Sequence, residues 1–321
     1  MTTQNSSKID ILLYWILNVS AAFMLSAAHN VLFFVLDIRT IVIHFLHYFC
    51  TFIFLFCSYS HLANIKILPP ALKKSLIPAV ISQIIVSLLT ARVHAGNRTG
   101  SLYLIRIFDF LATITALKIA PKLLGPSSRN RFQWKIMLPL TISASMSWME
   151  FGHLEYDIVG FYLAPFLAIA QGINVVILKK SYKTFISSSP QSSFEIFSLF
   201  HSGLVSVGLA LPALISYLKS VISYDASWEI IDYVLISMSV VFMACYKFSE
   251  YWLIFNTDLS VYFCLEHTKF FIGSIGQWFL QNMAHASVYA GIGKMLFVTS
   301  SIQFWQANEK ADKKAKHENT E

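Results

Sequence analysis

Long apolar stretches, each about 20 residues in length, follow one another along almost the whole chain. They lack the alternation of apolar and polar positions that marks the strands of a membrane barrel. A stretch of this length can cross the hydrocarbon core of a bilayer as a helix. We therefore expect an all-α polytopic membrane protein, because only helices and closed barrels satisfy their backbone hydrogen bonds in lipid.

Polar breaks such as LPPALKK, LGPSSRNR and SSSPQSS divide the apolar stretches into ten predicted transmembrane helices. The predicted spans cover residues 11–36, 41–60, 75–92, 101–119, 136–152, 158–178, 194–217, 230–252, 259–280 and 284–305. Five spans in each half would give the halves opposite orientations, as in the two inverted five-helix repeats of many secondary transporters. The expected domains are a first repeat over 1–157, a second repeat over 158–306 and a charged cytosolic tail over 307–321.

The distribution of lysine and arginine predicts the orientation of the chain. With ten spans and both termini in the cytosol, fifteen basic residues fall in cytosolic segments and four on the opposite side. The fifteen are Lys8, Lys66, Lys73, Lys74, Lys122, Arg129, Arg131, Lys135, Lys179, Lys180, Lys183, Lys310, Lys313, Lys314 and Lys316, and the four are Arg39, Arg92, Arg98 and Lys219. This bias follows the positive-inside rule, so we expect both termini in the cytosol.

Composition supports a membrane protein and argues against a nucleic-acid partner. Of the 321 residues, 56% are hydrophobic and 13% are charged, whereas soluble domains carry roughly 25% charged residues. The formal net charge is +7, but the basic residues are scattered through short loops without an aromatic–basic recognition motif. The four cysteines lie inside apolar segments and are interpreted as small buried side chains.

Ionisable residues inside the predicted spans are the candidate functional residues, since a charge at membrane depth costs about 2.5–3.5 kcal/mol. Three basic residues have an acidic partner three positions away: Arg106 with Asp109, Lys247 with Glu250, and Lys269 with Glu266. Each pair lies on one helix face, so one interpretation is a self-neutralised pair that only tunes packing. The other is a cavity lined by the three basic residues, which would suit an anionic solute such as phosphate.

Other polar and aromatic residues give weaker indications. Tyr246 precedes Lys247 and could stack on a base or a sugar, although anchoring at the membrane interface is the commoner role. His44 and His47 lie three positions apart without accompanying carboxylates, so no metal site is expected. The chain carries no HExxH, GxSxG or phosphate-binding loop motif. We therefore expect neither an enzyme nor a bound cofactor.

One predicted span carries a short motif with a known parallel. In HLEYDIVGFYLAPFLAIAQGINVVILKK, Gly160–Phe161 opens a span that ends in Asn174–Val175 and Lys179–Lys180. This resembles the GF…RNV…KK helix of the triose-phosphate/nucleotide-sugar translocator family, in the drug/metabolite transporter superfamily. The chain resembles a divergent member, because Asn174 stands where the family has arginine.

The resemblance extends to the first, fourth and ninth spans. Lys269 matches the lysine with which family members hold the substrate phosphate, and Arg106 lies roughly where a second phosphate-binding lysine is found. Plastid sugar-phosphate members follow the first lysine with arginine, whereas this chain has Phe270, which favours the nucleotide-sugar members. In LNVSAAFMLSAAHN, His29–Asn30 stands where Asn–Lys is usual.

The resemblance implies an antiporter in the Golgi or endoplasmic reticulum membrane. It would exchange a phosphorylated sugar or nucleotide sugar for phosphate or nucleotide monophosphate, and it is compatible with a homodimer. The intramembrane charges and the resemblance together give the candidate substrate-binding residues Lys269, Arg106, Lys247, Glu266, Glu250, Tyr246 and Asn174. Two alternatives stay open: a seven-span chemoreceptor-like protein, whose termini would lie on opposite sides, and a transporter-like scaffold without transport activity.

Overall fold

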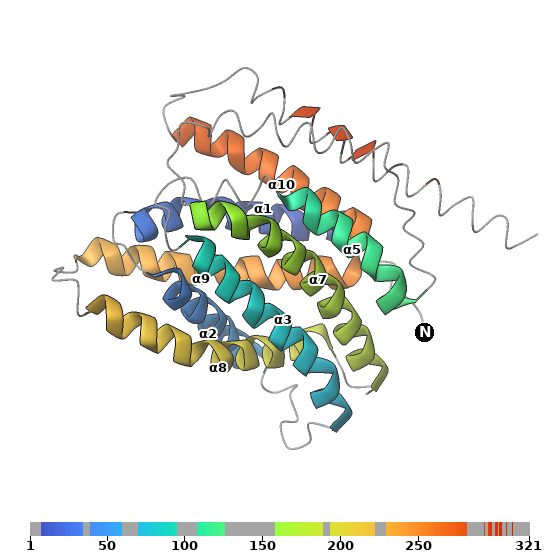
Figure 1. Cartoon of the computed structure of the whole chain (residues 1–321), viewed down its shortest axis with the longest axis horizontal. Helices are drawn as coiled ribbons and strands as arrows, with labels where there is room; N and C mark the ends of the chain where they lie inside the picture. Colours follow the sequence, from blue (N-terminus) through green and yellow to red (C-terminus); the bar gives the residue numbers. More distant parts are fainter. Residues whose placement is uncertain are drawn as a thin grey trace, which may run out of the picture. The chain divides into compact units, whose positions relative to one another are not determined.

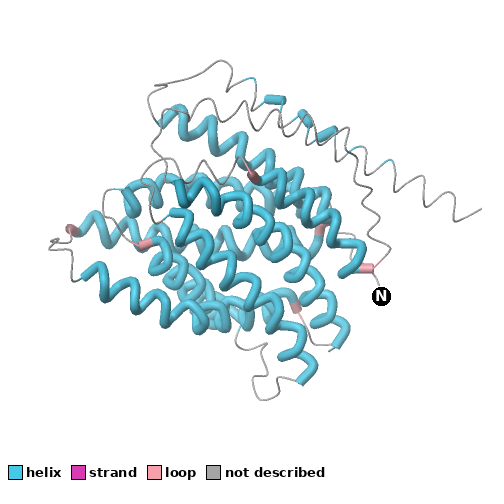
Figure 2. Tube along the Cα trace, viewed as in Figure 1, coloured by secondary structure: helices cyan, strands magenta, loops and turns pink. Residues whose placement is uncertain are grey.

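The structure, a computed structural model of the chain, describes residues 8–34, 39–59, 70–94, 108–125, 158–188, 193–221 and 229–280, with isolated helical positions between 292 and 310. All regular structure within these residues is helical (Figure 2). The helices are α1 (Lys8–Phe34), α2 (Thr40–Tyr59), α3 (Pro70–His94), α5 (Asp109–Leu124), α7 (Ile158–Ser188), α8 (Phe194–Val221), α9 (Ile230–Asn256) and α10 (Leu259–Leu280).

Six of these helices, namely α1, α2, α3, α7, α8 and α9, are long and apolar enough to cross a membrane. The chain is therefore a multi-pass membrane protein whose described part is helical, as its apolar pattern predicts. The described residues do not reach the predicted count of ten spans. The predicted span 136–152 lies outside them, and only isolated positions of the predicted span 284–305 lie within them.

Two helices differ clearly from their predicted bounds. Helix α7 runs to Ser188, ten residues beyond the predicted end at 178, and so includes Lys179, Lys180 and Lys183. Helix α5 covers Asp109–Leu124 in place of the predicted 101–119, of which the first seven residues lie outside the described part of the chain. Polar residues that the sequence pattern assigns to a loop can continue a helix when the fold gives them hydrogen-bond partners. Lys179 has such a partner in the Ile254 carbonyl oxygen.

The chain forms two compact units, each built from segments that are separate in sequence. Unit 1 comprises Met1–Arg98 and Ile177–Asn256, and unit 2 comprises Thr99–Val176 and Thr257–Glu321. Helix α7 therefore passes from unit 2 into unit 1 at Val176–Ile177, and the chain returns to unit 2 between α9 and α10. These spatial units do not coincide with the predicted repeats 1–157 and 158–306, which are sequence divisions and stay a prediction.

In unit 1, α1 lies along α9 and α2 lies along α8 (Figure 1). An apolar core joins α2, α3 and α8, and its buried members are Ile41, Tyr48, Val80, Val205 and Leu209. In unit 2, α5 packs against α10 and against the first part of α7. A β-carbon on Gly172 of α7 would collide with the carbonyl oxygen of Ala112 on α5, so glycine permits this close approach.

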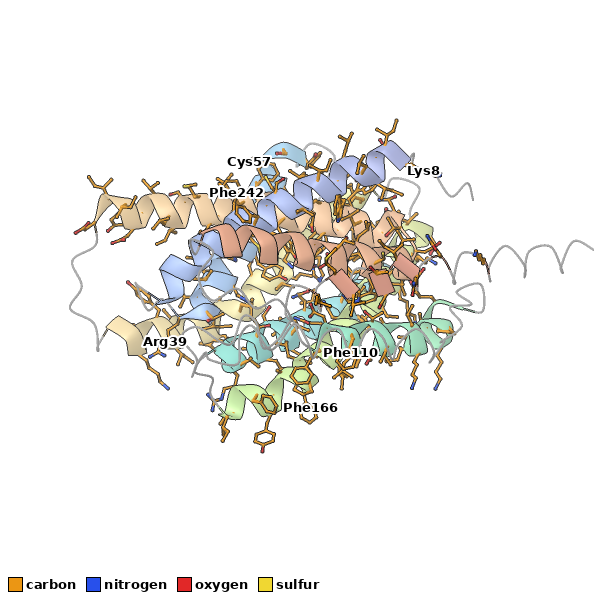
Figure 3. The ribbon with its side chains drawn as sticks, turned by 90° about the horizontal axis from the view of Figure 1, so that it is seen from above. Lys8, Arg39, Cys57, Phe110, Phe166 and Phe242 are labelled. Atoms are coloured by element: carbon orange, nitrogen blue, oxygen red, sulfur yellow. The ribbon has the colours of Figure 1, made fainter. Side chains whose placement is uncertain are left out.

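Large apolar side chains cover the outside of both units. Phe166 of α7 projects away from the ribbon and is 63% exposed (Figure 3). In unit 1, Val207 and Leu211 of α8 and Val241 of α9 are likewise exposed. Contiguous exposed apolar surface is unfavourable in water but is expected where helices face lipid.

Candidate functional site

An ion pair within α9 is the centre of the candidate site in unit 1. Lys247 Nζ donates to Glu250 Oε2 at 2.7 Å, and the two side chains are 11% and 16% exposed. The same ammonium lies 5.4 Å from the ring centre of Tyr48 on α2 and 5.6 Å from that of Tyr246. Aromatic faces attract a cation, so they help to hold the lysine charge away from water.

Two further titratable groups lie beside this ion pair. His201 Nδ1 of α8 shares a 2.7 Å hydrogen bond with the Tyr251 hydroxyl of α9, and both side chains are buried. Both lie within electrostatic range of Lys247. We call Tyr48, His201, Lys247, Glu250 and Tyr251 the titratable cluster. It joins three helices that are long enough to cross a membrane, where such groups are costly.

A polar link between α1 and α9 adjoins the titratable cluster. Asn18 of α1 is fully buried, and its Nδ2 donates to Ser249 Oγ at 3.0 Å and to the Tyr246 carbonyl oxygen at 3.2 Å. Next to it, Trp252 stacks on Tyr14 with ring centres 4.0 Å apart. These contacts fix the rotation of α9 against α1 and thereby orient Lys247.

Unit 2 contains the second predicted ion pair, within α10. Lys269 Nζ lies 2.6 Å from each carboxylate oxygen of Glu266. The lysine side chain is 4% exposed and the glutamate 20%, so the carboxylate is the more accessible partner. Next to this pair, His267 Nε2 shares a 2.9 Å hydrogen bond with Thr113 Oγ1 of α5. This hydrogen bond orients the His267 side of α10 toward α5.

The remaining predicted site residues are only partly placed by the structure. Asn174 is buried on α7, and Tyr246 is half-buried on α9, where its backbone oxygen accepts from Asn18. Arg106 lies outside the described residues. Lys247 belongs to unit 1 and Lys269 to unit 2. The expected cavity shared by the three basic residues therefore stays a prediction. The predicted ion pairs of Lys247 with Glu250 and of Lys269 with Glu266 are confirmed.

Lys179 corrects one interpretation of the sequence. The pattern places it in a loop after the predicted span 158–178, whereas the structure places it inside α7, where it is 6% exposed. Its cytosolic side stays a prediction. Its Nζ donates to the carbonyl oxygen of Ile254 at 2.9 Å, two residues before α9 ends at Asn256. The last carbonyls of a helix have no partner within the helix and carry its negative dipole end, so an ammonium is a suitable cap.

The histidines of α2 do not form a metal centre within the described residues. His47 Nε2 shares a 2.8 Å hydrogen bond with Ser239 Oγ of α9. Among the residues that the structure describes, no group of three or more His, Cys, Asp or Glu side chains is placed to hold a metal ion. The role of His47 that the geometry supports is a polar link between α2 and α9.

Comparison with known proteins gives a likeness of fold and no family. No protein-family model and no curated protein sequence matches the chain. A solved structure described only as "Crystal structure of protein" is similar, with a TM-score of 0.64 and 9% sequence identity. The match covers 92% of this chain and 96% of that one. At this identity the likeness shows a shared fold and nothing about activity.

Proposed function

We propose that the protein is a secondary transporter that exchanges a phosphorylated sugar or nucleotide sugar for phosphate or nucleotide monophosphate. The observation that carries the proposal is Lys269, an ion-paired lysine that is 4% exposed within the predicted span 259–280. A lysine at membrane depth normally serves a ligand or ion pathway, because packing alone is achieved at lower cost by apolar residues. Lys247, which is also buried and ion-paired, strengthens the proposal.

Phosphate is the ligand chemistry that suits these lysines. An ammonium gives three donors to an oxyanion, and each charge-assisted hydrogen bond contributes about 1.5–3 kcal/mol. Between transport events Glu266 and Glu250 neutralise the lysines, so the empty protein carries no unpaired charge at these two positions. The resemblance of Lys269 to the phosphate-binding lysine of nucleotide-sugar translocators points to the same class of ligand.

The proposal includes the features that accompany such a transporter. These are ten transmembrane helices in two inverted repeats, both termini in the cytosol, and residence in the Golgi or endoplasmic reticulum membrane. Asn174 and Arg106 would complete a phosphate site at Lys269, and Tyr246 would contact a ligand bound at Lys247. A homodimer is compatible with this arrangement.

Exchange in liposomes tests the proposal. The purified protein is reconstituted into vesicles preloaded with inorganic phosphate or uridine monophosphate, and uptake of labelled sugar phosphates and nucleotide sugars is measured. We expect uptake of at least one compound that depends on the preloaded anion. Lys269→Met should abolish uptake, whereas Lys118→Met, at an exposed position of α5 in the same unit, should not. Absence of exchange across the whole panel would favour a scaffold without transport activity.

A further inference from the structure

The titratable cluster of unit 1 has a property that simple anion binding does not need. Lys247 is already neutralised by Glu250 at 2.7 Å, and the other three members, Tyr48, His201 and Tyr251, are buried. An oxyanion that binds Lys247 must therefore compete with the Glu250 carboxylate for the same ammonium. A buried anion and a carboxylate that share one cation repel each other strongly, because the protein interior screens charge poorly.

We propose that Glu250 couples anion binding to the uptake of one proton. This inference rests on the proposed function and specifies how its second lysine operates. Oxygens of the anion replace Glu250 Oε2 on Lys247 Nζ, and a proton from solvent adds to the freed carboxylate oxygen. Only an O–H bond forms, and no covalent bond of the anion changes. The carboxyl is then neutral, and the lysine charge is used by the ligand.

The surroundings of Glu250 favour protonation over a move to another cation. Helices α1, α2 and α8 and the unit 1 part of α7 contact α9, and their described titratable side chains other than lysine are Asp10 and Tyr14 of α1, His44, His47, Tyr48, Cys50, Cys57 and Tyr59 of α2, Tyr182 of α7, and Glu195, His201 and Tyr217 of α8. Among the described lysine and arginine side chains of these segments, Lys8 and Lys219 lie near helix ends, Lys180 and Lys183 are exposed, and the ammonium of Lys179 already donates to the Ile254 carbonyl oxygen at 2.9 Å. The phenols and histidines offer hydrogen bonds but no permanent positive charge. A displaced carboxylate therefore lowers its energy by binding a proton.

The sign of the pH dependence follows from this exchange. Anion binding consumes a proton, so the affinity should fall as the pH rises, by at most about tenfold per pH unit for one coupled proton. Glu250→Gln has no carboxylate to protonate and should bind more tightly than the wild type at high pH and equally at low pH. If the anion instead displaced Glu250 without proton uptake, Glu250→Gln would bind the anion more tightly than the wild type by the same factor at every pH.

Titration calorimetry with inorganic phosphate, on the full chain in lipid nanodiscs, tests the coupling. Measurements at about pH 6 and about pH 8, in buffers of different ionisation enthalpy, give the affinity and the number of protons taken up. The wild type should take up about one proton more per phosphate than Glu250→Gln. Glu229→Gln, at an exposed position just before α9, should behave like the wild type. His201→Gln should retain the coupling.

Each outcome decides between definite alternatives. Equal proton numbers and equal pH dependence for wild type and Glu250→Gln would overturn the coupling and leave the proposed transporter intact. Loss of the coupling in His201→Gln but not in Glu250→Gln would overturn the role of Glu250. Absence of phosphate binding at both pH values would overturn the proposed function as well. If Glu250→Gln does not fold, the wild type alone at about pH 8 suffices, because free phosphate is then mostly a dianion and binding without proton uptake contradicts the coupling.

Discussion

Lys247 and Lys269 each form an ion pair with a residue of their own helix. Lys247 is followed at the third position by Glu250, and Lys269 is preceded at the third position by Glu266. An intrahelical pair does not depend on how the helix packs against its neighbours. Each lysine can therefore stay neutralised if the helices move against one another, which a pair between two helices would not allow.

The first prediction at this scale separates a ligand role of Lys269 from a packing role. Lys269→Met alone leaves Glu266 as an unpaired charge and should lower stability as well as exchange. The double variant Glu266→Gln/Lys269→Met removes both charges and should restore the melting temperature, yet phosphate binding should stay at least tenfold weaker than in the wild type. Thermal unfolding and liposome exchange measure the two effects. Normal exchange by the double variant would show that Lys269 only contributes to packing.

Lys179 carries a second prediction, which concerns stability. Lys179→Met keeps most of the apolar stem but removes the donor to the Ile254 carbonyl oxygen. The expected loss is about 1–3 kcal/mol in the free energy of unfolding, together with faster hydrogen exchange in the last turn of α9. The neighbouring Lys180→Met, at an exposed position, is the matched control. Equal melting temperatures for the two variants would contradict the capping role.

At the scale of helices, the apolar pattern predicts most of what the structure describes. Predicted spans 41–60, 230–252 and 259–280 correspond to α2, α9 and α10 within a few residues. The pattern fails at the end of α7 because it treats lysine as a loop residue. Whether Lys179 lies in water or against a helix end depends on α9, which is more than 50 residues away in sequence.

The partners within the candidate site could be predicted only where they are local. A spacing of three along a helix pairs Lys247 with Glu250 without any knowledge of the fold. The contact of Asn18 with Ser249, or of His201 with Tyr251, depends on which helices become neighbours and on their rotation. An isolated polar residue in an apolar stretch indicates that a partner exists but does not identify it.

The contact between α5 and α7 gives a prediction for helix packing. Gly172→Ala places a β-carbon against the backbone of Ala112, which cannot rotate away. Gly208→Ala, on α8, also meets a neighbour, but that atom is Cδ1 at the flexible end of Ile84. We therefore expect Gly172→Ala to destabilise the protein by about 1–3 kcal/mol and Gly208→Ala by clearly less. Thermal unfolding of both variants tests this, and the reverse order would contradict the close approach of α5 and α7.

At the scale of the whole molecule, the orientation in the membrane is the prediction to check. The surplus of lysine and arginine in the predicted cytosolic segments predicts that both termini lie in the cytosol. A glycosylation acceptor fused to either end should stay unmodified, whereas a protease applied to intact vesicles should remove a tag from either end. Glycosylation of one terminus only would indicate an odd number of spans, as in the seven-span alternative.

The interleaved construction of unit 1 also has a consequence for the synthesis of the protein. Asn18 is fully buried, and its partner Ser249 follows 231 residues later in the chain. At 5–20 residues per second, a ribosome needs roughly 10–50 s to extend the chain from Asn18 to Ser249. During that interval α1 is inserted without the helix that satisfies its amide, in a solvent that offers no hydrogen bonds. The helices inserted first must therefore remain in the bilayer or bound to an insertion factor until α9 has been synthesised, and α9 then completes unit 1.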